Sequence, residues 1–149
     1  MEDILDRNLR GMTEAVRRNE ITSVDLVQGF LDRIEKVNSS LNAVVSINTE
    51  IALKLAAKAD SDLKEGIVHG PLHGIPMTIK DSLDTKDMVT TWGPKGRETF
   101  RPGRDATSVA RLREAGAILL GKTNTPEFTL SFQTDNLVYG RTNNPYNLE

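Results

Sequence analysis

A lysine closes an apolar run in the segment GPLHGIPMTIKDSLD, residues 70–84. Apolar side chains stand at every second position from 75 to 79, which predicts a strand with one buried face that ends at Lys80. A lysine can take the proton of a serine hydroxyl, but only when it is neutral. On its own, Lys80 is better explained as a solvated charge at a strand end, paired with Asp81. The surrounding residues must decide between the two.

The segment GAILLGKT, residues 116–123, matches the P-loop pattern G-x-x-x-x-G-K-[ST]. A P-loop needs a strand before its first glycine and a helix that starts at its lysine, because the helix amides bind phosphate. Here a helical pattern precedes Gly116, strand-forming residues separate the two glycines, and Asn124-Thr125-Pro126 follows. The segment is therefore interpreted as a helix stop and a buried strand.

Two further patterns could support other chemistry. His69 and His73 have the spacing of zinc ligands on one helical face, but the glycines and the proline between and beside them forbid that helix. Ser82, one of these histidines and Asp84 could form a hydrolytic triad, yet no G-x-S-x-G turn is present. We therefore expect no metal, no cofactor and no triad of this kind.

The first half of the chain predicts helices around one strand. Apolar residues recur at helical spacing over 5–16, and Asn19 interrupts them. A capping box formed by Thr22 and Asp25 begins a second helix, which is expected to end near Asn38. The run AVVSI at 43–47 predicts a strand, and an alanine-, leucine- and lysine-rich stretch at 50–64 predicts a third helix.

The second half predicts strands alternating with a helix. Glycines and prolines make residues 66–76 a loop, and the strand ending at Lys80 follows. Asp105 can cap a helix that runs through Ala115, and Gly116 can stop it before the strand AILL at 117–120. The order predicts an α/β fold with N-terminal helices followed by part of a mixed sheet flanked by helices.

Composition excludes several classes of protein. The 149 residues are 38% hydrophobic and 27% charged, with a net charge of −2, which is typical of a globular domain. No basic footprint for nucleic acid or an anionic membrane is present. The acidic start lacks the pattern of a signal peptide, no apolar run approaches a membrane span, and cysteine is absent. We expect a cytoplasmic protein with a small-molecule partner.

Three separated blocks favour the catalytic interpretation of Lys80. They are GPLHGIPMTIKDSLDTKDMVTTWG, DATSVARLREAGAILLGKTNTPEF and YGRTNNPYN. In order and spacing they resemble the amidase signature family of serine hydrolases. The resemblance implies an α/β/α sandwich, here incomplete, and amide-bond cleavage through an acyl-enzyme by a Ser, cis-Ser and Lys triad. The lysine of the GIPMTIKD block is the base of that triad, which makes Lys80 the catalytic residue.

The two serines of the triad are not among the 149 residues. In the family they lie in a G-G-S-S-G-G stretch shortly after an asparagine-proline-aromatic motif, here Asn144, Pro145 and Tyr146, and the sequence ends at Glu149. The resemblance implies the N-terminal portion of one amidase domain, with a helical lead-in and one strand over 1–66 and the start of the signature core over 67–149. It also implies that the isolated chain is inactive.

The resemblance to the family implies substrate-binding residues in only one segment of this sequence. Phe132, Gln133 and Thr134, within SFQTDN, stand where the family lines its acyl pocket, although ordinary turn and helix packing explains them equally well. Residues 91–94, Thr-Trp-Gly-Pro, replace the T-x-G-S turn of many relatives, which points to a differently shaped loop and leaves the substrate open.

Two alternatives remain at this stage. The same blocks occur in the A subunit of tRNA-dependent amidotransferases, although the segments around Glu127 and Tyr139 look more like free-standing amidases. The chain could also be a non-catalytic binding or assembly module whose exposed sheet joins another chain or a second copy. The leading interpretation is an amidase acting on a small-molecule amide, with no nucleic acid and no membrane as partner.

Overall fold

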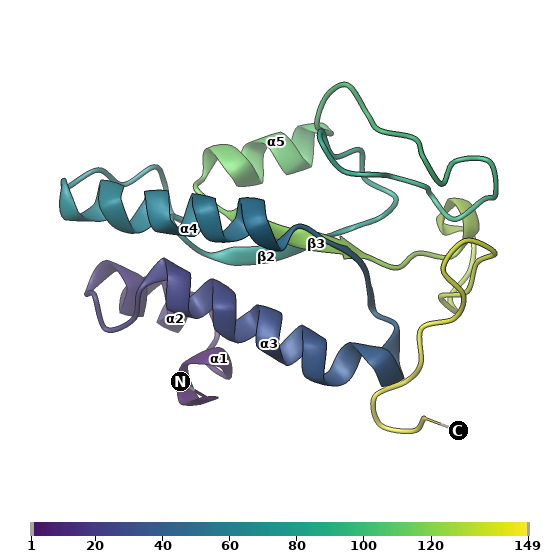
Figure 1. Cartoon of the computed structure of the whole chain (residues 1–149), viewed down its shortest axis with the longest axis horizontal. Coiled ribbons are helices and arrows are strands. Elements are labelled where there is room, and N and C mark those ends of the chain that lie inside the picture. Colours follow the sequence, from purple (N-terminus) through teal and green to yellow (C-terminus); the bar gives the residue numbers. More distant parts are fainter. Residues whose placement is uncertain (1, 149) are drawn as a thin grey trace. The chain divides into compact units, whose positions relative to one another are not determined.

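The computed structural model describes residues 2–148, which form helices and a small sheet (Figure 1). Its helices are α1 (Glu2–Leu5), α2 (Leu9–Arg17), α3 (Ser23–Leu41), α4 (Thr49–Lys64), α5 (Thr107–Glu114) and a short 3-10 helix, η1 (Glu127–Thr129). Its strands are β1 (Val44–Ile47), β2 (Pro76–Lys80) and β3 (Ile118–Thr123). None of the helices in this part of the chain is long and apolar enough to cross a membrane.

The chain divides into two compact units. The first contains the residues up to 34 together with 48–77 and 111–120, and the second contains 35–47, 78–110 and the residues from 121 onward. Lys80 and the chain that follows it belong to the second unit.

The N-terminal helices differ from the prediction at two places. The expected single helix over 5–16 is wrong, because the chain breaks after Leu5 and restarts at Leu9, where the side chain of Asn8 caps α2 by accepting the Gly11 amide at 2.9 Å. The capping box is confirmed, since the hydroxyl of Thr22 accepts the Asp25 amide at 3.0 Å.

The second helix also continues further than expected. It ends at Leu41 instead of near Asn38. The side chain of Asn38 does not stop the helix; it accepts the amides of Ala43 and Val44 at 2.9 and 2.8 Å. This side chain therefore fixes the turn that leads into β1.

The three strands form a mixed sheet in the order β1-β3-β2, which confirms the predicted fold class. Strand β1 is antiparallel to β3, with Ser46 opposite Lys122 and Ile47 opposite Gly121. Strand β2 runs parallel to β3, because Ile75 accepts the Ile118 amide and Thr123 accepts the Asp81 amide, both at 2.8 Å. The carboxyl ends of β2 and β3 thus lie at the same edge of the sheet.

The two apolar clusters lie in the first unit. One joins α3 and α4 to the start of β3, and its buried members are Val27, Leu31, Ala52, Ala56, Ala59, Ile118 and Leu120. The other joins α2 and α3 to the start of β2, and its buried members are Ala15, Val16, Ile21, Leu26 and Ile75. Because Ile75 and Ile79 are both buried, the predicted apolar face of β2 is confirmed.

Gly121 allows the close approach of β1 to β3. A Cβ atom built at this position would lie 2.1 Å from the carbonyl oxygen of Ser46, which belongs to the backbone and has little freedom to move away. Gly103, in the loop before α5, has no atom within 4 Å of its built Cβ. Comparing an alanine substitution at Gly121 with one at Gly103 therefore distinguishes a steric requirement for glycine from the general effect of adding a methyl group.

We predict that Gly121→Ala lowers the free energy of unfolding by about 3 kcal/mol, the upper end of the usual cost of overpacking. The matched Gly103→Ala should change it by less than about 0.5 kcal/mol or raise it slightly. Urea denaturation followed by circular dichroism measures both. Equal stabilities for the two variants would show that β1 moves away from β3 without cost.

Candidate active site

Lys80 is the last residue of β2 and is half-buried. Its neighbour Ile79 is buried, so the lysine lies on the opposite side of the strand from the apolar face. Within residues 2–148, no hydrogen bond or ion pair joins the Lys80 ammonium to another residue. The expected alternative, a charge pair with Asp81, is therefore not formed in the described structure.

Asp81 instead turns its carboxylate into the protein and is fully buried. Its Oδ2 accepts hydrogen bonds from the Thr91 amide at 3.0 Å and from the Thr91 hydroxyl at 2.5 Å. Burial raises the pKa of Asp81 above its usual value, and the Thr91 hydrogen bonds and the charge of Lys122 act in the opposite direction. Its Oδ1 is buried and has no hydrogen-bond partner in the described part of the chain.

Lys122 is fully buried inside β3. Its ammonium donates to the carbonyl of Leu83 at 2.6 Å, to the hydroxyl of Thr85 at 2.8 Å and to the hydroxyl of Thr90 at 3.2 Å. Because this lysine lies within a strand, and Gly116 with a φ of 93° ends α5 before it, the interpretation of GAILLGKT as a helix stop and a strand is confirmed.

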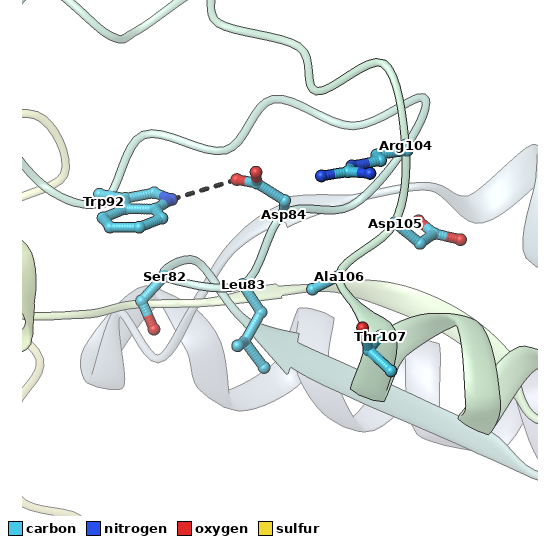
Figure 2. Close-up of a pocket in the computed structure, with 8 residues that line it drawn as sticks. All are labelled: Ser82, Leu83, Asp84, Trp92, Arg104, Asp105, Ala106 and Thr107. Atoms are coloured by element: carbon cyan, nitrogen blue, oxygen red, sulfur yellow. Dashed lines mark hydrogen bonds between the residues drawn. The ribbon is translucent and has the colours of Figure 1, made fainter.

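A pocket of about 410 Å³ opens beside the loop that follows Lys80 (Figure 2). Its lining residues are Ser82, Leu83, Asp84, Trp92, Arg104, Asp105, Ala106 and Thr107. Figure 2 shows Trp92 and Arg104 on opposite sides of Asp84, with the indole N–H of Trp92 donating to the Asp84 carboxylate at 3.3 Å. The pocket therefore combines an aromatic ring, a cation and carboxylates at the carboxyl end of β2, where α/β sheets commonly bind ligands.

A network of amide side chains fixes the segment after β3. Asn136 donates to the Asn124 side chain at 2.7 Å and to the carbonyl of Thr125 at 2.8 Å, and it accepts the amides of Val138 and Tyr139. Asn124 in turn donates to the carbonyl of Gly140 at 2.9 Å. The network holds residues 136–140 against the end of β3.

The residues expected to line an acyl pocket lie just before this network. Phe132 is fully exposed, Gln133 is exposed, and the carbonyl of Thr134 accepts the Thr142 amide at 2.9 Å. No hydrogen bond in residues 2–148 joins any of the three to Lys80. Their role in substrate binding stays a prediction.

The side chains of His69 and His73 form hydrogen bonds with residues other than Ser82. His69 Nε2 lies 2.6 Å from the Asp62 carboxylate. His73 Nδ1 accepts the His69 amide at 3.2 Å, so its Nε2 carries the proton and donates to the carbonyl of Ala59 at 3.0 Å. Both ring nitrogens of His73 and the Nε2 of His69 are thus engaged. In residues 2–148, no cluster of three histidine, aspartate or glutamate side chains could hold a metal.

Sequence reasoning missed two functional candidates, Asp81 and Lys122. Lys122 was seen only as part of a false P-loop, although a lone lysine inside the apolar strand ILLGKT is itself a signal of a buried, hydrogen-bonded charge. Asp81 was interpreted as the partner of Lys80. Its position next to Lys80 at the end of a strand already indicates that the two side chains point to opposite sides.

Comparisons with known proteins agree with this architecture. The profile of the family described as Amidase matches residues 25–149, and the chain therefore belongs to the amidase family. It is 39% identical over 138 residues to the glutamyl-tRNA(Gln) amidotransferase A subunit of Carboxydothermus hydrogenoformans, covering 93% of this chain and 28% of that protein. It is 41% identical over 145 residues to fatty-acid amide hydrolase 2-B of Danio rerio, with the same two coverages.

A solved structure shows the same arrangement. The native peptide amidase of Stenotrophomonas maltophilia superposes with a TM-score of 0.88 at 36% identity, over 96% of this chain and 31% of that one. The chain thus spans less than a third of the length of each of these relatives.

Tyr139 reports on the buried surroundings of Asp81. Burial raises the pKa of Tyr139 above its usual value, and the nearby negative charge of Asp81 raises it further, while a hydrogen bond with Thr91 acts in the opposite direction. A raised pKa in the folded state means that the protonated phenol stabilises the fold at neutral pH. This contribution is lost as the pH rises through the folded-state pKa.

We predict that the phenol of Tyr139 titrates at a higher pH in the native chain than in the unfolded chain, because its pKa is raised in the folded state. The sequence has two tyrosines, so a Tyr146→Phe variant isolates Tyr139 for spectrophotometric titration at 295 nm. Unfolding in guanidinium should return the transition to about 10, the usual tyrosine value. The shift should be lost in Tyr139→Phe. An identical transition in folded and unfolded chains would contradict a half-buried Tyr139 near the charge of Asp81.

Proposed function

We propose that the full-length protein hydrolyses amide bonds and that Lys80 is its general base. The observation that carries this proposal is the position of Lys80. It is half-buried at the carboxyl end of a parallel strand, without a hydrogen bond or ion pair in residues 2–148, in the GIPMTIKD block that supplies the base in the family. A base must accept a proton, and the Lys80 amine is not engaged by another residue in the described part of the chain.

In the proposed reaction, a serine outside the 149 residues is the nucleophile. Its hydroxyl proton passes through a second serine to the Lys80 amine while its oxygen attacks the amide carbonyl carbon. The C–N bond then breaks, the proton is returned to the leaving amine, and water hydrolyses the acyl-enzyme. Each proton taken up by Lys80 is thus released before the next step.

The substrate class follows from the relatives only as a proposal. Their names include a peptide amidase, a fatty-acid amide hydrolase and one subunit of glutamyl-tRNA(Gln) amidotransferase. We propose a small-molecule or peptide amide, with Phe132, Gln133 and Thr134 lining the acyl pocket. The second candidate is an amidotransferase A subunit, favoured by the 39% identity to one. Hydrolysis of a small-molecule or peptide amide by the purified full-length protein, without a partner protein, would favour the first candidate.

We predict that Lys80→Ala in the full-length protein lowers kcat about 10²- to 10⁴-fold, the usual contribution of a general base, with little change in the melting temperature. Lys80→Arg should be equally impaired, because a guanidinium does not give up its proton near neutral pH. In the wild type, kcat/KM should fall as the pH is lowered, since a protonated lysine cannot accept a proton. Steady-state kinetics with a simple aryl amide measure all three.

Lys95→Ala, at an exposed lysine in the same unit, is the matched control and should keep wild-type kinetics. Residues 1–149 expressed alone should neither turn over the amide nor react with a fluorophosphonate probe, because they lack the nucleophile. Wild-type activity in Lys80→Arg over the whole pH range would rule out Lys80 as the base. Probe labelling of the isolated chain would point to a serine within it.

We also propose that the isolated chain self-associates through its sheet edges and its exposed apolar side chains. Strands β1 and β2 are the edge strands of the sheet, and Leu130 and Phe132 are 85% and 109% exposed. Exposed edges and contiguous apolar side chains favour association. Sedimentation velocity should show the average mass rising with concentration, and less so for Phe132→Ser. A monomer at all concentrations would contradict this.

A further inference from the structure

We propose that Lys122 is a positioning residue for Lys80: its buried ammonium holds the chain that leaves β2 and so fixes the place of the base. The inference rests on the proposed function, because it concerns how the base of that reaction is held. Lys122 itself is fully buried and contacts the chain beyond Lys80, so its effect on catalysis is indirect.

A direct path of hydrogen bonds leads from Lys122 to Lys80. The Lys122 ammonium donates to the carbonyl of Leu83 at 2.6 Å, and the amide of Leu83 donates to the carbonyl of Lys80 at 3.0 Å. The turn that ends β2 is therefore held from both sides of Leu83. A shift of this turn moves the backbone from which the Lys80 side chain extends.

The remaining contacts of the ammonium fix the next part of the same loop. Thr85 and Thr90 accept from Lys122 at 2.8 and 3.2 Å, and both threonines are fully buried. The hydroxyl of Thr85 also donates to the carbonyl of Leu83 at 3.0 Å. An ammonium has three donors, and these three oxygens match them in number. One side chain thus gathers three points of a loop that has no helix or strand of its own.

Asp81 secures the same segment at a second place. Its amide donates to the carbonyl of Thr123, the residue after Lys122, and its carboxylate accepts from Thr91. The charge of Lys122 acts on this carboxylate across the interior. The residues on both sides of the turn are therefore tied to β3 and to its buried charge, while Lys80 itself is free of protein contacts that would engage its amine in the described part of the chain.

Positioning matters for this reaction because a general base must lie within about 2.6–3.2 Å of the proton it removes. A misplacement of about 1 Å can lower a rate about 10²-fold. Methionine resembles lysine in length but has no donor, so Lys122→Met keeps the volume of the side chain and removes all three hydrogen bonds. The turn then loses its attachment to β3 without a large cavity.

The test uses the full-length protein and a double-mutant cycle. Lys122→Met should lower kcat about 10- to 100-fold, because the Lys80 amine is then misplaced relative to the proton that it removes. KM should stay within about twofold of the wild type. In a Lys80→Ala background, Lys122→Met should have no further effect on kcat, because a residue that acts through Lys80 has nothing left to position. Lys58→Met, which breaks the ion pair between the exposed ammonium of Lys58 and the buried carboxylate of Asp62 on α4, is the matched control and should keep wild-type kcat.

A purely structural role gives a different outcome. Lys122→Met would then lower the melting temperature while the folded enzyme kept its kcat, or the losses from the two lysine variants would multiply in the double variant. Either result overturns the positioning role of Lys122 but leaves the proposed role of Lys80 as the general base unaffected. An unchanged kcat in Lys80→Ala would instead overturn the proposed function, and with it this inference.

If Lys122→Met does not fold, two milder variants still test the proposal. Thr85→Val and Thr90→Val each remove one acceptor of the ammonium at nearly constant side-chain volume. Each should lower kcat about 3- to 10-fold in the wild-type background, less than Lys122→Met, because only one of the three hydrogen bonds is removed. In the Lys80→Ala background, each should leave kcat unchanged. Wild-type kcat in both threonine variants would overturn the positioning role.

Discussion

The burial of one charge, the ammonium of Lys122, constrains the second compact unit more than any other interaction described. Removing an ion from water costs several kcal/mol in a protein interior unless hydrogen bonds and an opposite charge compensate. The chain meets this requirement by bringing a carbonyl and two hydroxyls of the loop after β2 to the ammonium, with Asp81 as the nearby carboxylate. The course of residues 81–91 is therefore set by the needs of a side chain about 35 residues away.

The two units are held by different kinds of interaction. In the first unit, the buried clusters are aliphatic side chains and alanines from α2, α3, α4 and the starts of β2 and β3. In the second unit, many of the buried side chains are polar, among them Asp81, Thr85, Thr90, Thr91, Lys122, Asn124, Thr125 and Asn136. Apolar packing tolerates small shifts, whereas hydrogen bonds require particular distances and angles. A unit specified by hydrogen bonds is suited to hold a reactive side chain in one place.

The sequence predicted those features that follow from local patterns. Alternation located β2 and placed Lys80 at its end, the capping box located the start of α3, and Gly116 marked the end of α5. The break at Asn8 was missed because the apolar spacing continues across it, while the cap depends on a single side chain. The partners of Asp81 and Lys122 could not be predicted, since they lie 10 and more than 30 residues away and depend on how the loop folds back. The alternative pair of Lys80 with Asp81 is not formed for a different, local reason: neighbours in an extended chain point to opposite sides.

Asn42 shows what such long-range polar contacts imply for the newly made chain. Its side chain donates to the carbonyls of Tyr139 and Arg141 at 2.7 and 3.0 Å, 97 and 99 residues later in the sequence. At translation rates of about 5 to 20 residues per second, the turn before β1 is synthesised roughly 5 to 20 s before its partners. The apolar clusters that involve α2, α3 and α4 can begin to assemble in that interval. The turn before β1 is therefore completed only near the end of synthesis of these 149 residues.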